Sequence, residues 1–260
     1  MRVARIVLSF VLILSSSPQL SSQQSPTTVM RDPQAVTLLQ GSVRAMGGTV
    51  PADSAATGNV TIVAGSLTSS GTIQILTRGT NQTSEQITLP QSTVTVIYSG
   101  GLANQTNNSV VTSLSVQRAA TSQSVYFPLP FLSGALANSD MSVQYVALET
   151  LNQSSVQHIQ LQNTYASQPN LQQFASFAVF DVWLDAVTSL PQRVSYTRRD
   201  ASGASPGISV DTYFAAYKTI SGVAYPSQIN VSYNGTPWAT ITISSVSFNT
   251  GLTDSNFPIQ

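Results

Sequence analysis

Two aspartates, Asp181 and Asp185, have the spacing in this chain that best suits acid–base chemistry; they lie in the segment FDVWLDAVTSLPQRV. Paired carboxylates can act as general acid and base when burial raises the pKa of one of them. In an extended strand the two acids share one face, while Phe180, Val182 and Leu184 share the other. Because the second face is wholly apolar, we expect it to be buried and the acids to point outward with ordinary pKa values. We therefore interpret the segment as a scaffold hairpin in which Asp185 begins the turn.

A second candidate is the stretch GASPG at 203–207, which matches the G-x-S-x-G pattern of serine hydrolases. In those enzymes the residue after the serine donates its N–H to the oxyanion. Here that residue is Pro206, which has no N–H. The only histidine, His158, precedes Ser205, against the usual hydrolase order. We interpret the stretch as a turn between strands, and we expect neither Ser205 nor Asp185 to be catalytic.

Metal chemistry has little support in the sequence. The chain contains one histidine and no cysteine, which argues against a zinc site. No D-x-D-x-D-G loop is present for calcium. His158 lies in SVQHIQLQ on the strand face opposite Ile159 and Leu161, so we expect it to be solvated. We predict no metal, no cofactor and no enzymatic activity.

The charge content is low and nearly balanced. Charged residues make up 8% of the chain, with 10 basic and 10 acidic residues. Removing Arg2 and Arg5 with the N-terminal segment would leave 8 basic against 10 acidic residues. Such a chain would not neutralise a phosphate backbone, so we expect no nucleic-acid partner. Arg193, Arg198 and Arg199 form the only basic cluster, which we interpret as a solvated surface feature.

The N-terminus has the pattern of a secretory signal peptide. A basic start is followed by an apolar run from Ile6 to Leu14 and then by small residues. We predict a signal peptide over 1–22, a flexible leader over 23–31 and a single domain over 32–260. Absence of cysteine from a secreted chain favours a bacterial envelope, and we expect a periplasmic or secreted protein.

Periodicity predicts one long helix and many strands. Asp32 and Pro33 suit a helix start, apolar residues recur at helical spacing up to Met46, and two glycines follow. From Thr57 the period becomes two, typical of an antiparallel meander of about ten strands. The dipeptide at 234–235, Asn-Gly, predicts a hairpin turn. A sheet of this width curls, and three segments could cover its concave face: 33–46, 127–137 and 169–177. They could fill this face or leave a lipid-sized pocket.

The last third of the chain resembles the outer-membrane lipoprotein carrier and sorting proteins of Gram-negative bacteria. The resemblance lies in the order of hairpins and in these positions: Leu190-Pro191, Tyr217, Gly222-Val223, Tyr225-Pro226, Asn249, Asp254 and Phe257. A helix ending in AMGG at 45–48 fits the start of such chains. The resemblance implies a mainly β (α+β) fold, a half-open antiparallel β-barrel with helices across its concave side. It also implies binding of acyl chains of lipoproteins.

We therefore predict a non-enzymatic periplasmic protein that holds a lipid or the acyl chains of a lipoprotein in an apolar cavity. The partners would be that lipid or acylated protein, with transient contact to envelope membrane proteins, and we expect a monomer. The alternative is a structural or adhesive envelope protein with a filled core. The predicted cavity residues are Ile62, Ile75, Val96, Phe131, Leu132, Phe174, Val182, Leu184, Phe214, Ile229, Val231 and Ile241.

Overall fold

The protein folds around one antiparallel sheet that curls over a helix. We describe residues 28–199 and 207–260 of a computed structural model. The signal-peptide prediction, most of the predicted leader and Ser205 lie outside these residues. No helix among the described residues is both long and apolar enough to cross a bilayer.

Thirteen strands form the sheet. They are β1 Asp53–Ala64, β2 Leu67–Arg78, β3 Gln82–Leu89, β4 Ser92–Ser99, β5 Leu102–Asn107, β6 Val110–Ser113, β7 Met141–Leu151, β8 Ser154–Asn163, β9 Val179–Asp185, β10 Pro191–Arg198, β11 Ile208–Ile220, β12 Val223–Tyr233 and β13 Thr236–Phe248. Their spatial order is β6-β5-β4-β3-β2-β1-β13-β12-β11-β10-β9-β8-β7. Each strand pairs with its sequence neighbour, except that β13 returns to pair with β1 and joins the two halves. The predicted fold class is confirmed: the sheet is open, with β6 and β7 at its two edges.

The expected number of strands was too low because β5 and β6 were missed. Their segment, LANQTNNSVVTS, is polar and lacks the apolar alternation that predicts a strand. The two strands are joined through Asn108 and Ser109, both with positive φ, at 45° and 75°. Two positive φ angles in a row are typical of a type I′ hairpin turn. Pairing with β4 supplies the stabilisation that an apolar face would otherwise give.

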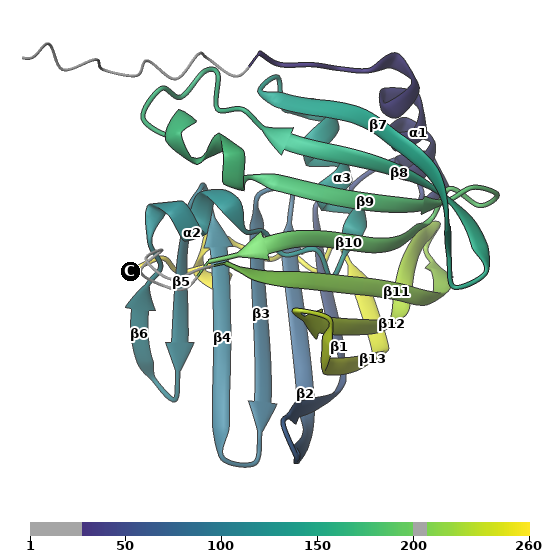
Figure 1. The fold of residues 1–260 in the computed structure, drawn as a ribbon. Coiled ribbons are helices and arrows are strands. Elements are labelled where there is room, and N and C mark those ends of the chain that lie inside the picture. Colours follow the sequence, from purple (N-terminus) through teal and green to yellow (C-terminus); the bar gives the residue numbers. More distant parts are fainter. Residues whose placement is uncertain (1–27, 200–206) are drawn as a thin grey trace, which may run out of the picture.

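Three α-helices and two 3₁₀-helices accompany the sheet: α1 Pro33–Ala45, α2 Val116–Thr121, α3 Pro128–Ala137, η1 Gln172–Phe177 and η2 Asp254–Asn256. The Asp32 carboxylate caps α1 as predicted, accepting hydrogen bonds from the N–H groups of Gln34 (2.7 Å) and Ala35 (3.3 Å). Just before α1, Arg31 forms a parallel bridge with Val143 on the edge strand β7. In Figure 1, α1 lies beside β7, and α2 lies at the end of the sheet away from the β3–β4 turn.

The helix α3 fills one part of the concave face. Leu129 and Leu132 have no exposed surface, and Phe131 contacts Phe180 of β9 with ring centroids 5.1 Å apart. The helix starts at Pro128, within the segment 127–137 that was expected to cover the concave face. Helix α3 belongs to one core cluster that includes residues from both halves of the sheet, such as Ile75 of β2 and Val182 of β9. This shared apolar core joins the two halves.

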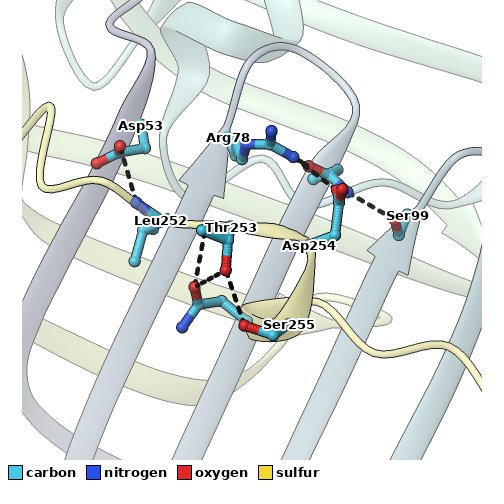
Figure 2. A network of polar contacts seen from close by, with 9 residues as sticks. Asp53, Arg78, Ser99, Leu252, Thr253, Asp254 and Ser255 are labelled. Carbon is cyan, nitrogen blue, oxygen red and sulfur yellow. Dashed lines mark hydrogen bonds and ion pairs between the residues drawn. The ribbon is translucent and has the colours of Figure 1, made fainter.

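The C-terminal segment 249–260, here called the strap, crosses the ends of the strands (Figure 2). It forms hydrogen bonds along its length with Asp53 of β1, Arg78 of β2, Gln82 of β3, Asn104 of β5 and Ser113 of β6.

Asp53 is 4% exposed, and its carboxylate accepts hydrogen bonds from Thr250 N–H (2.6 Å), Gly251 N–H (2.9 Å) and Leu252 N–H (3.1 Å). Burial raises the pKa of Asp53, but these hydrogen bonds outweigh burial and lower the pKa overall.

We expect Asp53→Asn to lower the free energy of unfolding by about 3 kcal/mol, because the amide nitrogen replaces an oxygen that accepts two hydrogen bonds and so places a donor against two donors of the strap. Urea unfolding followed by circular dichroism would measure the change. Asp254→Asn is the matched control, since its side chain is 84% exposed and its ion pair with Arg78 is on the surface. Equal stability of the two variants would show that the strap is not held through Asp53.

Candidate functional site

A cavity of about 330 Å³ lies between the two halves of the curled sheet, beside the part that α3 fills. Its lining comes from β1, from β3 to β5, from β10 to β13, from α2 and from the segment 123–126. The lining residues are Ile62, Glu85, Ile87, Leu89, Val94, Val96, Tyr98, Gln105, Arg118, Gln123, Val125, Tyr126, Tyr196, Arg198, Val210, Tyr233 and Trp238. The concave face is thus filled in one part and hollow in another.

One end of the cavity is apolar, and strand register shows which end. Ile87 of β3 pairs with Val94 of β4, next to the β3–β4 turn, and Leu89 follows at the turn itself. One step further from the turn, Glu85 pairs with Val96, and beyond this pair lies Tyr98. Since alternate residues share a face, the cavity changes from apolar to polar along the direction from the turn toward α2.

The polar end contains a half-buried carboxyl and a half-buried guanidinium from opposite halves of the sheet. The Glu85 carboxylate of β3 accepts a hydrogen bond from the Ser124 hydroxyl. Across the cavity, Arg198 of β10 donates from Nη1 to the Tyr233 hydroxyl (2.7 Å), and its guanidinium lies 4.3 Å from the Tyr233 ring centroid. Tyr233 in turn stacks on Trp238 at 4.6 Å. Burial raises the pKa of Glu85 to about 7, opposed by the Ser124 hydroxyl and the charge of Arg198.

A second guanidinium comes from the short helix α2. Arg118 is 7% exposed and donates from Nη1 to the backbone carbonyl of Arg199 (2.8 Å). Its Nε is buried and has no hydrogen-bond partner among the described residues. Burial raises the pKa of Tyr98, which Arg118 opposes, so this tyrosine is a neutral hydroxyl at the polar end.

The predicted cavity residues fall into three groups. Ile62 and Val96 line the cavity, while Phe131 lines a separate small pocket of about 130 Å³. Phe174 packs in a minor cluster with Tyr165 and Ala178 around η1. The others are buried in the main core: Ile75, Leu132, Val182, Leu184, Phe214, Ile229, Val231 and Ile241.

Asp185 begins the turn after β9, as predicted. Its carboxylate accepts hydrogen bonds from the N–H groups of Val187 (3.0 Å) and Thr188 (2.7 Å) and from the Gln192 amide (2.7 Å). Burial raises its pKa, but these bonds lower the pKa overall, so the expectation of an ordinary value was wrong. A lowered pKa keeps this carboxyl ionised at neutral pH, which suits a turn and not a general acid.

The expectation of a solvated His158 was wrong. His158 is 9% exposed and stacks on Trp183 with ring centroids 4.3 Å apart. Its Nδ1 lies 2.8 Å from Glu149 and its Nε2 lies 3.0 Å from Asp181. Neighbouring strands β7, β8 and β9 bring these side chains together, a pairing that the sequence of one strand does not show. They belong to the face of the sheet opposite the buried Ile159 and Val182, so His158 does not line the cavity.

The interpretation of the arginine cluster as a solvated surface was also wrong. Arg198 lines the cavity, whereas Arg193 faces the other way, with its guanidinium 4.1 Å from the Trp183 ring and its Nη2 2.6 Å from Asp211. The guanidinium of Arg199 lies 4.4 Å from the Phe177 ring. Alternation along β10 separates Arg193 from Arg198, and both find aromatic neighbours.

The polar residues of the cavity were not predicted, among them Glu85, Tyr98, Arg118 and Arg198. For Glu85 and Tyr98 the signal was present, because Glu85 shares a strand face with Ile87, and Tyr98 shares one with Val96. For Arg198 the same alternation links it to the buried Val194. Arg118 lies in residues 110–118, whose sequence pattern is compatible with either a helix or a strand, so no comparable signal existed for it.

The chain has the fold of outer-membrane lipoprotein-sorting proteins. An outer membrane lipoprotein-sorting protein domain from Vibrio parahaemolyticus matches with a TM-score of 0.56 at 15% identity, over 86% of this chain and 96% of that chain. A LolA superfamily protein from Nitrosomonas europaea matches with a TM-score of 0.57 at 14% identity, over 86% and 97%. A DUF1329 family protein from Desulfovibrio piger matches with a TM-score of 0.54 at 14% identity, over 86% and 97%. No protein-family model and no curated protein sequence matches the chain.

We expect the stability of the protein to fall as pH rises toward 7 and Glu85→Gln to remove part of this fall. The pKa of Glu85 is about 7 in the folded protein against a usual value of 4.5. The folded state therefore binds more protons between these values, and stability is lost as pH rises through them. The full effect is about 3 kcal/mol. Urea unfolding at several pH values from 4 to 8 would measure it.

Glu149→Gln is the control for this pH series. Hydrogen bonds from Trp183 and His158 lower the pKa of Glu149. The contribution of Glu149 to stability therefore depends on pH in the opposite sense to that of Glu85. It is lost as pH falls through the lowered pKa. A Glu85→Gln variant whose stability runs parallel to that of the wild type across the range would contradict a raised pKa.

Proposed function

We propose that this protein is a non-enzymatic periplasmic binding protein that holds an acyl chain in the cavity between the two halves of its sheet. The observation that carries the proposal is the cavity itself. Its apolar end is built from aliphatic side chains on β1, β3 and β4, including Ile62, Ile87 and Val94. Apolar walls with a few convergent polar groups are typical of small-molecule sites.

The fold supports the same proposal. Two proteins with this fold are described as a lipoprotein-sorting domain and a LolA superfamily protein. The same likeness and the signal-peptide pattern at the N-terminus support a periplasmic location.

The size of the cavity limits the ligand. A volume of about 330 Å³ is at the small end of the range of ligand pockets, ~300–1,000 Å³. It suits one acyl chain, and each buried methylene would contribute ~0.8 kcal/mol before ordering costs. A ligand with several chains would require α3 to leave the part of the concave face that it fills.

Within the described residues, the cavity lining contains no serine, threonine or cysteine that could act as a nucleophile. The single histidine lies on the other face of the sheet, and Ser124 donates to a carboxyl that is itself partly protonated near neutral pH. These geometries favour binding over hydrolysis.

Native mass spectrometry of protein purified from the cells that make it is expected to show a bound lipid. After lipid removal, the uncharged dye N-phenyl-1-naphthylamine should gain fluorescence with the protein, and methyl dodecanoate should displace it. Val96→Trp places a large side chain in the cavity and should weaken dye binding at least tenfold.

Val146→Trp is the matched control, since Val146 is 47% exposed on the edge strand β7, and this variant should bind the dye as the wild type does. Absence of a bound lipid together with no dye binding by the wild type would favour a structural envelope protein with no small ligand.

A further inference from the structure

The polar end of the cavity has more positive than negative charge. Two guanidinium groups, Arg118 and Arg198, line it together with one carboxyl, Glu85. In the described part of the chain neither arginine forms an ion pair with a carboxylate. The remaining titratable groups of the lining are neutral hydroxyls, whose pKa values burial raises: Tyr98, Tyr126, Tyr196 and Tyr233.

Glu85 is a weak counter-charge for two arginines. Its pKa of about 7 means that it is close to half protonated at neutral pH. Its hydrogen bond comes from Ser124 and not from either arginine. Buried charges are normally paired, so the cavity lacks at least one negative charge.

Arg118 provides an independent sign of a missing anion. The residue is 7% exposed, and its Nε donor is buried without a partner in residues 28–199 and 207–260. An unpaired buried donor on a charged group is costly, and Arg forms its strongest hydrogen bonds with carboxylate or phosphate. Because the Nε atom is itself buried, an acidic group in the cavity would pair with the part of the Arg118 side chain that lines the cavity and would offset its charge.

The positively charged side chains and the aliphatic side chains lie at opposite ends of the cavity. Arg118 is on α2 itself and Arg198 is on β10, which contacts α2. Ile87, Leu89 and Val94 are next to the β3–β4 turn. A molecule with an acidic group at one end and an aliphatic chain at the other would match both ends.

We propose that the ligand is a single-chain acidic amphiphile whose carboxylate or phosphate is held by Arg118 and Arg198, with its chain toward the β3–β4 turn. This proposal rests on the proposed function, since it names the chemical class of the molecule in the same cavity. The head group pairs the two guanidinium groups, and the chain supplies the apolar burial.

Isothermal titration calorimetry on the lipid-free protein tests the proposal with three ligands of equal chain length: dodecanoate, dodecyl phosphate and methyl dodecanoate. At least one acid should bind tenfold or more tightly than the uncharged ester. The tighter of the two acids identifies the head group as carboxylate or phosphate.

Variants of the two arginines locate the head group. Arg198→Met and Arg118→Met should each weaken binding of the acid at least tenfold and leave binding of the ester within a factor of two. Arg118→Lys should recover part of the affinity for the acid. Arg44→Met, on the exposed side of α1, is the control and should change neither ligand. Thermal unfolding of each variant confirms that it is folded.

The outcomes separate this proposal from the one on which it rests. Equal affinity of the wild type for acid and ester would overturn the head-group assignment and leave acyl-chain binding in place. Failure of all three ligands, together with no dye binding, would overturn both. Loss of acid and ester binding alike in a folded Arg198→Met variant would show that the arginine shapes the cavity without recognising the head group.

Discussion

The structure depends on how one wide antiparallel sheet buries a single apolar face. Thirteen strands in one sheet present more apolar surface than the helices can cover. Curling brings the two halves of the sheet to face each other, and α3 fills part of the space between them with side chains such as Leu129 and Leu132. Where α3 ends, the halves meet only across a cavity. The filled part and the hollow part are therefore consequences of the same curvature.

The cavity is the part of the concave face that contains charged side chains. Glu85 and Arg198 approach from opposite halves, and neither has a full ion pair in the described residues. Desolvation raises the pKa of Glu85, and Arg198 donates to Tyr233, a neutral oxygen. Such an arrangement costs free energy in the empty protein. Perturbed pKa values and unpaired polar groups cluster at functional sites, so the polar end agrees with the proposed binding of a ligand.

The opposite face of the sheet shows how the same residue types behave when their charges are paired. His158, Trp183 and Arg193 stack across adjacent strands, and Glu149 and Asp211 accept their hydrogen bonds. This network contains the residues most typical of catalysis, yet its donors are satisfied by side chains of the sheet itself. The network links side chains of β7 to β11 across the sheet, which agrees with the interpretation of the Asp181–Asp185 segment as scaffold.

Local signals determined much of the secondary structure. Asp32 and Pro33 start α1 because capping needs only the next few N–H groups. Asn234 and Gly235 make a turn because both adopt positive φ, at 49° and 75°. Alternation along single strands also identified which face of β9 is buried. Each of these features depends on residues close together in the chain, so the sequence alone contained them.

Tertiary structure alone decided the site. Whether Ile75 and Val182 would line a cavity or pack against α3 depended on where that helix lies, and both are in the core. The polar end combines Glu85, Arg118 and Arg198, which come from three elements that only the curl of the sheet brings together. Likewise β5 and β6 form because β4 offers an edge to pair with. Periodicity records the face on which a residue lies, but it contains no information about which distant strand that face will meet.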